Sequence, residues 1–146
     1  MATRSRIAIE DQDGKVRSIY CHFDGYPSNN GVILNENYKT QEKVESLISL
    51  GAISFLQEEV DIPEGVIHNF NNQEKGITVA YHRDRGEDLS IEEHDSVEDF
   101  IRSDVEEYGY VFTAAGEWLF VDGHTSASQR ESKSLERVLE SKGIFN

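Results

Sequence analysis

Two pairs of strand-like runs, each closed by a short turn, constrain the fold of this sequence more than any other feature. Within residues 7–23, apolar residues alternate with polar ones on both sides of a turn at 11–14. Within residues 108–121, two aromatic-rich runs flank a second turn at 114–116. The sequence therefore predicts two antiparallel hairpins.

Three segments outside these hairpins carry apolar residues at helical spacing. The first begins at Thr40, a residue type that caps helices, and stops at Gly51. The second begins at Ser96, which starts a sequence resembling a capping box. The third carries an apolar stripe from Leu135 and ends at Gly143. We expect a helix in each segment.

The rest of the chain gives one more strand and two loops. Residues 76–82 alternate as a strand, whereas 27–31 and 52–76 have loop compositions. The resulting order, ββα-β-α-ββ-α, lacks the βαβ alternation of parallel folds. It favours one α+β domain over 1–146, with a largely antiparallel sheet of about five strands and about three helices on one face. Residues 122–146 are a candidate peripheral C-terminal helix.

The charge of the chain limits its partners. A formal net charge of -14, from 28 acidic and 14 basic residues, disfavours direct binding to nucleic acid or to an anionic membrane. No span of about 20 apolar residues and no signal region is present, so we expect a soluble cytoplasmic protein. Cys21 is the single cysteine, which fits a reducing compartment.

The stretch 22–27 places polar and aromatic residues where a strand pattern stops. His22 and Asp24 lie there, and the same His-x-Asp pattern returns as His82 and Asp84 at the end of the strand expected over 76–82. If both strands end on the same edge of the sheet, two imidazoles and two carboxylates meet, a set suited to Zn²⁺ or Mn²⁺. The alternative is that each histidine only hydrogen-bonds a neighbour, which is the commoner outcome.

The same two segments predict a cationic and aromatic pocket for a phosphate or nucleotide. Arginine offers bidentate hydrogen bonds to phosphate, and aromatic rings stack on a base. The candidate ligand-binding residues are His22, Asp24, Tyr26, Tyr81, His82, Arg83 and Arg85. The alternative is that the two arginines pair with nearby acids at the surface.

A third hypothesis concerns the acid-rich segment 86–107, which could imitate a nucleic-acid backbone, although a solvated acidic face accounts for it more simply. Cys21 falls on the core face of its strand, where a thiol is inert. The aromatic hairpin 108–121 is explained mostly by core packing. We find no phosphate loop or nucleophile elbow, and expect no cofactor.

Several stretches resemble a family of small proteins encoded by tailed bacteriophages and prophages. They are Thr3-Arg4-Ser5-Arg6-Ile7, Ser18-Ile19-Tyr20-Cys21-His22-Phe23-Asp24-Gly25-Tyr26-Pro27, the helix around 43–51, Arg83-Asp84-Arg85-Gly86-Glu87, and Glu107-Tyr108 with the hairpin after it. Members of this family have Trp or Phe at the position of Phe23. The resemblance implies a phage accessory protein that acts inside a bacterial host cell, and it implies no particular mechanism.

These observations lead to one main hypothesis and two alternatives. The main hypothesis is a non-enzymatic accessory protein of the host bacterial cytoplasm that binds a host protein or a nucleotide-like small molecule. The alternatives are a small metal-dependent hydrolase or phosphodiesterase using His22, Asp24, His82 and Asp84, and an acidic nucleic-acid mimic. The sequence leaves open whether the protein forms oligomers.

Overall fold

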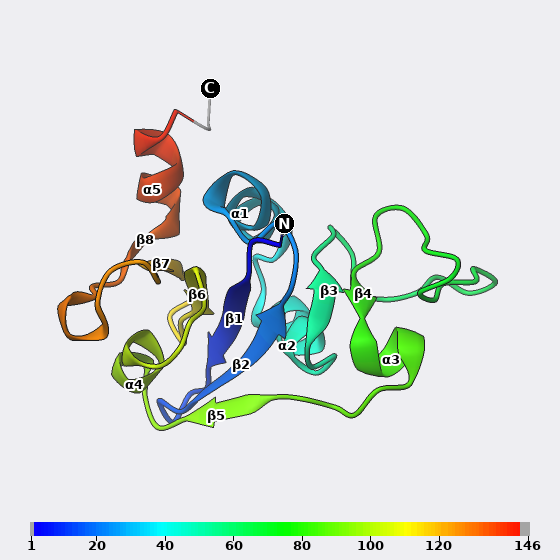
Figure 1. The fold of residues 1–146 in the computed structure, drawn as a ribbon, viewed down its shortest axis with the longest axis horizontal. Helices are drawn as coiled ribbons and strands as arrows, with labels where there is room; N and C mark the ends of the chain where they lie inside the picture. The colour runs from blue at the N-terminus through cyan, green and yellow to red at the C-terminus, as the bar shows by residue number, and fades with distance from the viewer. Residues whose placement is uncertain (1, 144–146) are drawn as a thin grey trace.

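The computed structural model describes residues 2–143 as a single-domain α+β fold built on one mixed sheet (Figure 1). Met1 and residues 144–146, the end of the expected C-terminal segment, lie outside the described residues. The strands are β1 (Ser5–Glu10), β2 (Val16–Cys21), β3 (Ile53–Phe55), β4 (Val79–Ala80), β5 (Glu92–His94), β6 (Tyr108–Phe112), β7 (Trp118–Asp122) and β8 (Lys133–Ser134). The helices are α1 (Val32–Asn37), α2 (Gln41–Ile48), α3 (Tyr81–Arg85), α4 (Val97–Arg102) and α5 (Leu135–Ser141), with short helical turns η1 (Pro27–Gly31) and η2 (Ala127–Gln129).

The strand order along the sheet is β4-β3-β2-β1-β6-β7-β8, and β5 pairs with the beginning of β2. β1 with β6 and β2 with β3 are parallel pairs, while the other neighbours are antiparallel. The α+β class is as predicted, but the sheet is mixed and has more strands, and there are more helices, than expected. The additional strands have only two or three residues, which is too short for a period-two pattern to identify them.

The sheet separates two apolar cores. On one face, Ile7 and Ile19 pack in a cluster with apolar residues of α1, α2 and α5. On the other face, Ala8 and Val111 pack with Phe100 and neighbouring residues of α4. The helices therefore cover both faces, not one as predicted. α5, within the expected peripheral segment, buries Leu135 completely in the first core.

The features with the clearest sequence signals are confirmed. Both hairpins form, with β1 pairing β2 and β6 pairing β7. The Thr40 hydroxyl accepts a hydrogen bond from the Lys43 N–H at 3.2 Å, and the Ser96 hydroxyl accepts one from the Asp99 N–H at 3.1 Å. These two caps begin α2 and α4 where the sequence predicts.

Two segments differ from the prediction. The strand expected over 76–82 is reduced to β4, and the chain then turns into α3, which Gly86 ends in a left-handed conformation with φ of 75°. The loop expected at 27–31 is instead the helical turn η1, which leads directly into α1. Gly31 is buried there, and a Cβ atom on it would lie 3.3 Å from Leu135. The absence of a side chain at Gly31 therefore lets this turn pack closely against α5. None of the described helices has the length and apolar character needed to span a membrane.

Candidate functional site

The two His-x-Asp triplets do not converge, because the strands that carry them run in opposite directions. Cys21 of β2 is paired with Ile53 of β3, which is parallel to β2. Ile53 is also paired with Ala80 of β4, which is antiparallel to β3. The chain beyond Cys21 and the chain beyond Ala80 therefore leave the same row of the sheet in opposite directions, with β3 between them (Figure 1). The premise that both triplets end on the same edge of the sheet is therefore wrong.

The groups of the expected metal cage are instead bound locally. His22 Nδ1 lies 2.7 Å from the Tyr20 hydroxyl, and His82 Nδ1 lies 2.7 Å from the Glu87 carbonyl oxygen. Among residues 2–143 no group of three or more histidine, cysteine, aspartate or glutamate side chains is arranged to hold a metal ion. His22, Asp24, His82 and Asp84 thus form no cage, since opposite strand directions separate the two pairs.

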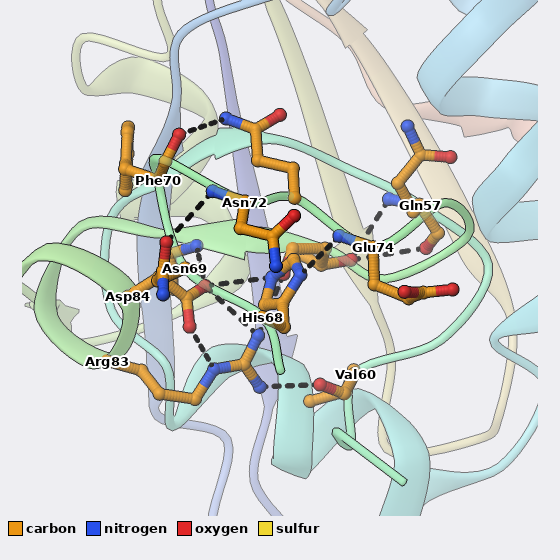
Figure 2. A network of polar contacts seen from close by, with 12 residues as sticks. Gln57, Val60, His68, Asn69, Phe70, Asn72, Glu74, Arg83 and Asp84 are labelled. Atoms are coloured by element: carbon orange, nitrogen blue, oxygen red, sulfur yellow. Dashed lines mark hydrogen bonds and ion pairs between the residues drawn. The ribbon is translucent and has the colours of Figure 1, made fainter. Parts of the chain in front are cut away.

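Arg83 and Asp84 form the centre of a polar network instead of a phosphate pocket (Figure 2). Arg83 Nε donates to Asp84 Oδ1 at 2.8 Å, and the two terminal nitrogens donate to the carbonyl oxygens of Val60 at 2.5 Å and Thr78 at 2.8 Å. Asp84 Oδ2 accepts the Ala80 N–H at 2.7 Å. All three guanidinium nitrogens are therefore used inside the protein. The ion-pair alternative expected a pair at the surface, whereas Asp84 is buried and two carbonyl oxygens also bind Arg83.

His68, which the sequence analysis did not single out, completes this network. Its Nδ1 accepts the Glu74 N–H at 3.0 Å, so the ring proton is on Nε2. Nε2 lies 3.2 Å from the Thr78 carbonyl oxygen and 3.3 Å from Asp84 Oδ2. A lone histidine in a loop of polar residues gives no sequence signal for such a role, because its partners are 6 to 16 positions away in the chain.

The network also sets the protonation state of Asp84. Burial acts to raise the pKa of this carboxyl group, but the hydrogen bonds from Arg83 and from the Ala80 N–H outweigh it. The pKa of Asp84 therefore lies below its ordinary value. A charged Asp84 that joins α3, β4 and His68 is well suited to hold the loop 56–78 in place, and it is not exposed to a ligand.

Arg85 and Tyr81 form a second small cluster with Phe70. The Phe70 and Tyr81 rings are stacked with centroids 5.4 Å apart, and the guanidinium carbon of Arg85 lies 4.4 Å from the Phe70 centroid and 5.1 Å from that of Tyr81. Arg85 also pairs with Glu87. Charge and ring contacts of Arg85 are thus satisfied within the protein.

Residues His22 to Tyr26, which we name the aromatic turn, present the remaining candidate residues to solvent. Phe23 and Tyr26 are 41% and 38% exposed, and they are among the few large apolar side chains that are exposed in residues 2–143. The Phe23 ring meets the His22 ring edge to face, with centroids 4.5 Å apart. Asp24 is exposed beside them.

The backbone of the aromatic turn is rigidly held. Asp24 adopts a φ of 57°, a left-handed conformation that is uncommon for residues other than glycine and that aspartate adopts more readily than most. Gly25 donates its N–H to the Thr3 carbonyl oxygen at 2.8 Å and accepts the Tyr110 hydroxyl at 2.6 Å. A Cβ atom at Gly25 would lie 2.6 Å from Ser5 Cβ. Only glycine fits this contact without a shift of the backbone.

Cys21 lies directly beneath the aromatic turn and takes no part in its surface. It is buried in the first core, as the period-two pattern predicts. Burial raises the pKa of the thiol to about 11, and the Asn30 amide donates to its sulfur at 3.4 Å. The thiol is therefore protonated and shielded at neutral pH.

The remaining sequence candidates are divided between core and surface. The aromatic side chains of the second hairpin are mainly core residues, and Trp118 is only 7% exposed. In the acid-rich segment, Glu87, Glu92 and Glu98 pair with the arginines Arg85, Arg6 and Arg102. These pairs reduce the negative charge that a nucleic-acid mimic needs on its surface.

Comparison with protein-family models, with curated proteins and with solved structures found no match to this chain.

Proposed function

We propose that this protein acts by binding another protein through the aromatic turn, without catalysis. The observation that carries the proposal is the combination of two exposed rings, Phe23 and Tyr26, with a backbone held in an uncommon left-handed conformation at Asp24. Strained, over-determined backbone is concentrated at functional positions. Aromatic side chains are the residues that most often dominate the binding energy of protein interfaces.

The rigidity of the turn favours such a role. A binding loop that is already ordered loses little conformational entropy when its partner arrives. The bonds of Gly25 to Thr3 and Tyr110 provide this order before binding. The histidine and acid at His22 and Asp24 supply polar groups around the rings, which resembles the polar rim of an interface.

The chemistry of the aromatic turn favours a protein over a nucleotide as its partner. A nucleotide site at these positions requires free guanidinium groups, whereas Arg83 and Arg85 are engaged with Asp84, Glu87 and carbonyl oxygens. A protein surface requires only exposed rings and a polar rim. The resemblance to phage proteins supports a protein of the bacterial host as the partner, and the host cytoplasm as the place of binding.

The proposal is tested by quantitative capture from a bacterial lysate with matched variants. Phe23→Ala combined with Tyr26→Ala removes both rings, and each ring is expected to contribute about 2 kcal/mol, so the double variant loses binding by a factor of about 10³. The control is Ile67→Ala, which removes an apolar side chain that is 69% exposed on the loop 56–78.

A host protein that is retained by the wild type and by the Ile67→Ala control, and released by the double variant, supports the proposal. Thermal unfolding of all three proteins shows that the variants remain folded. Identical sets of captured proteins for all three would overturn the aromatic turn as the contact surface.

A further inference from the structure

A hollow beside α5 gathers positive charge in an otherwise strongly acidic protein. It has a volume of about 750 Å³ and lies between the end of β7, the connection 125–131, β8 and one side of α5. This connection loops away from α5 after β7 (Figure 1, orange). The volume falls in the range of about 300–1,000 Å³ that is usual for small-molecule sites.

The wall of this hollow is fixed before any ligand arrives. Arg130 donates to the carbonyl oxygens of Thr125 at 2.8 Å, Ile101 at 3.0 Å and Ser103 at 2.6 Å. Arg102 donates to the Ala127 carbonyl oxygen at 2.5 Å. The connection is thereby joined to the end of α4, so its shape does not depend on a ligand.

The charge of the hollow is opposite to that of the molecule. Four of the 14 lysines and arginines line it, together with two acids, in a chain with a net charge of -14. Within residues 2–143, the side chains of Lys133 and Arg137 are exposed and make no ion pair or hydrogen bond. This contrasts with Arg83, Arg85 and Arg102, whose charges are paired.

The lining also sets the chemical class of a ligand. Lys133 and Arg137, with the hydroxyl group of Ser134, are donors suited to the acceptor oxygens of a phosphate, whereas the Ser141 hydroxyl already donates to the Val138 carbonyl oxygen at 3.0 Å. Asp122 and Glu131 lie on the same lining, and they repel a uniformly charged polyanion. Asp122 Oδ1 already accepts the His124 backbone N–H at 2.9 Å, so within residues 2–143 the other Asp122 oxygen and the Glu131 carboxylate are the acceptors open to hydroxyl or amino groups.

We propose that this hollow binds a small organic phosphate of about nucleotide size, with the phosphate at Lys133 and Arg137 and the neutral, donor-bearing part toward Asp122 and Glu131. Arg137 also lines a neighbouring hollow of about 690 Å³ with Lys39. Arg137 is therefore reachable from two recesses, whereas Lys133 lines the first of them and not the second. The site is independent of the aromatic turn, so either proposal can fail alone.

The test is a titration of isotope-labelled protein, followed by amide NMR, with adenosine monophosphate, adenosine and inorganic phosphate as separate probes. Adenosine monophosphate should give saturable shifts in 125–142, inorganic phosphate weaker ones and adenosine none. Lys133→Gln with Arg137→Gln should raise the Kd for adenosine monophosphate about tenfold or more, because each charge-assisted bond to phosphate is lost.

The matched control is Lys15→Gln with Lys75→Gln, which removes the same charge from two exposed lysines elsewhere and should leave the Kd unchanged. Equal weakening by both double variants would mean that net charge, not a site, attracts the probe. Absence of saturable shifts, or saturable binding of a hexaglutamate peptide in place of adenosine monophosphate, would overturn the proposal.

Discussion

Asp84 shows how one buried side chain can organise a long irregular segment. Its carboxylate receives hydrogen bonds from Arg83 and the Ala80 N–H, and His68 lies beside it (Figure 2). Through Arg83 these bonds extend to the Val60 carbonyl oxygen. One charge therefore connects α3 and β4 to two points of the loop 56–78.

We expect Asp84→Asn to destabilise the protein by about 3 kcal/mol at pH 7, because it leaves Arg83 without its buried partner. The cost depends on pH. The folded-state pKa of Asp84 lies below that of the unfolded chain, so the unfolded chain takes up the proton first as the pH falls. The stabilisation is complete above about pH 5 and is lost as the pH falls through the folded pKa.

Urea unfolding at a series of pH values measures this effect. The difference in the free energy of unfolding between wild type and Asp84→Asn should become smaller as the pH falls. Asp88→Asn, a change of an exposed carboxylate nearby, is the control and should cost less than about 0.5 kcal/mol at every pH. A difference in the free energy of unfolding that stays constant with pH would contradict a charged Asp84 in the folded protein.

At the scale of elements, the aromatic turn combines Asp24, which has a left-handed backbone conformation, with Gly25, which packs tightly against Ser5 and Thr3. Gly25→Ala should destabilise the protein by about 2 kcal/mol, since the added Cβ would lie 2.6 Å from Ser5 Cβ and 2.9 Å from the Thr3 carbonyl oxygen. The neighbouring change Asp24→Gly relieves the left-handed strain but loosens the unfolded chain, so the two effects offset each other to within about 1 kcal/mol.

Thermal or urea unfolding of the two variants compares them directly. Equal stability of Gly25→Ala and the wild type would mean that the backbone of the aromatic turn can shift at little energetic cost. This result would argue against a contact surface that is ordered before binding. A large loss in Asp24→Gly would show that the Asp24 side chain, not only its backbone, holds the turn.

The elements that the sequence predicted are those with local signals. The first hairpin alternates over two six-residue strands, the second consists of two aromatic-rich five-residue strands around a turn, and α2 and α4 begin at side chains that cap them. α3 was missed because Val79, Tyr81 and their neighbours alternate as a strand does. The signal for its end, Gly86, is recognisable only after the helix is known.

For the candidate site, too, the sequence predicts only the part that depends on local information. The exposed residues of the aromatic turn follow from the end of β2, which is local information. Whether Asp24 and Asp84 meet depends on β3 lying between β2 and β4 and on the direction of each strand. A strand of three residues inside a long loop carries no pattern that reveals either fact.

At the scale of the whole molecule, the net charge of -14 opposes the compact state. Salt screens this repulsion over distances beyond about 10 Å at 0.1 M, while the close pairs around Asp84 are buried and screened less. We therefore expect the Tm to rise by about 3 °C between low and moderate sodium chloride concentrations, equivalent to about 1 kcal/mol. Scanning calorimetry at several salt concentrations measures this change in Tm. A Tm that falls with added salt would mean that surface ion pairs stabilise the protein more than the repulsion between its acidic residues destabilises it.

The molecule has two separate surfaces with different chemistry. The aromatic turn is apolar with a polar rim, and it continues from the end of β2. The hollow at α5 is cationic and follows β7. Only the first carries the proposed protein contact, so substitutions at Lys133 and Arg137 should leave capture of the protein partner unchanged.

The most direct test of the protein contact is photo-crosslinking in bacterial cells, with a photoreactive phenylalanine analogue in place of Tyr26 or, as a control, Ile67. We predict one dominant cross-linked protein from position 26, none from position 67, and loss of the product when Phe23→Ala is added. Equal cross-linking from both positions, or none from position 26, would contradict the account.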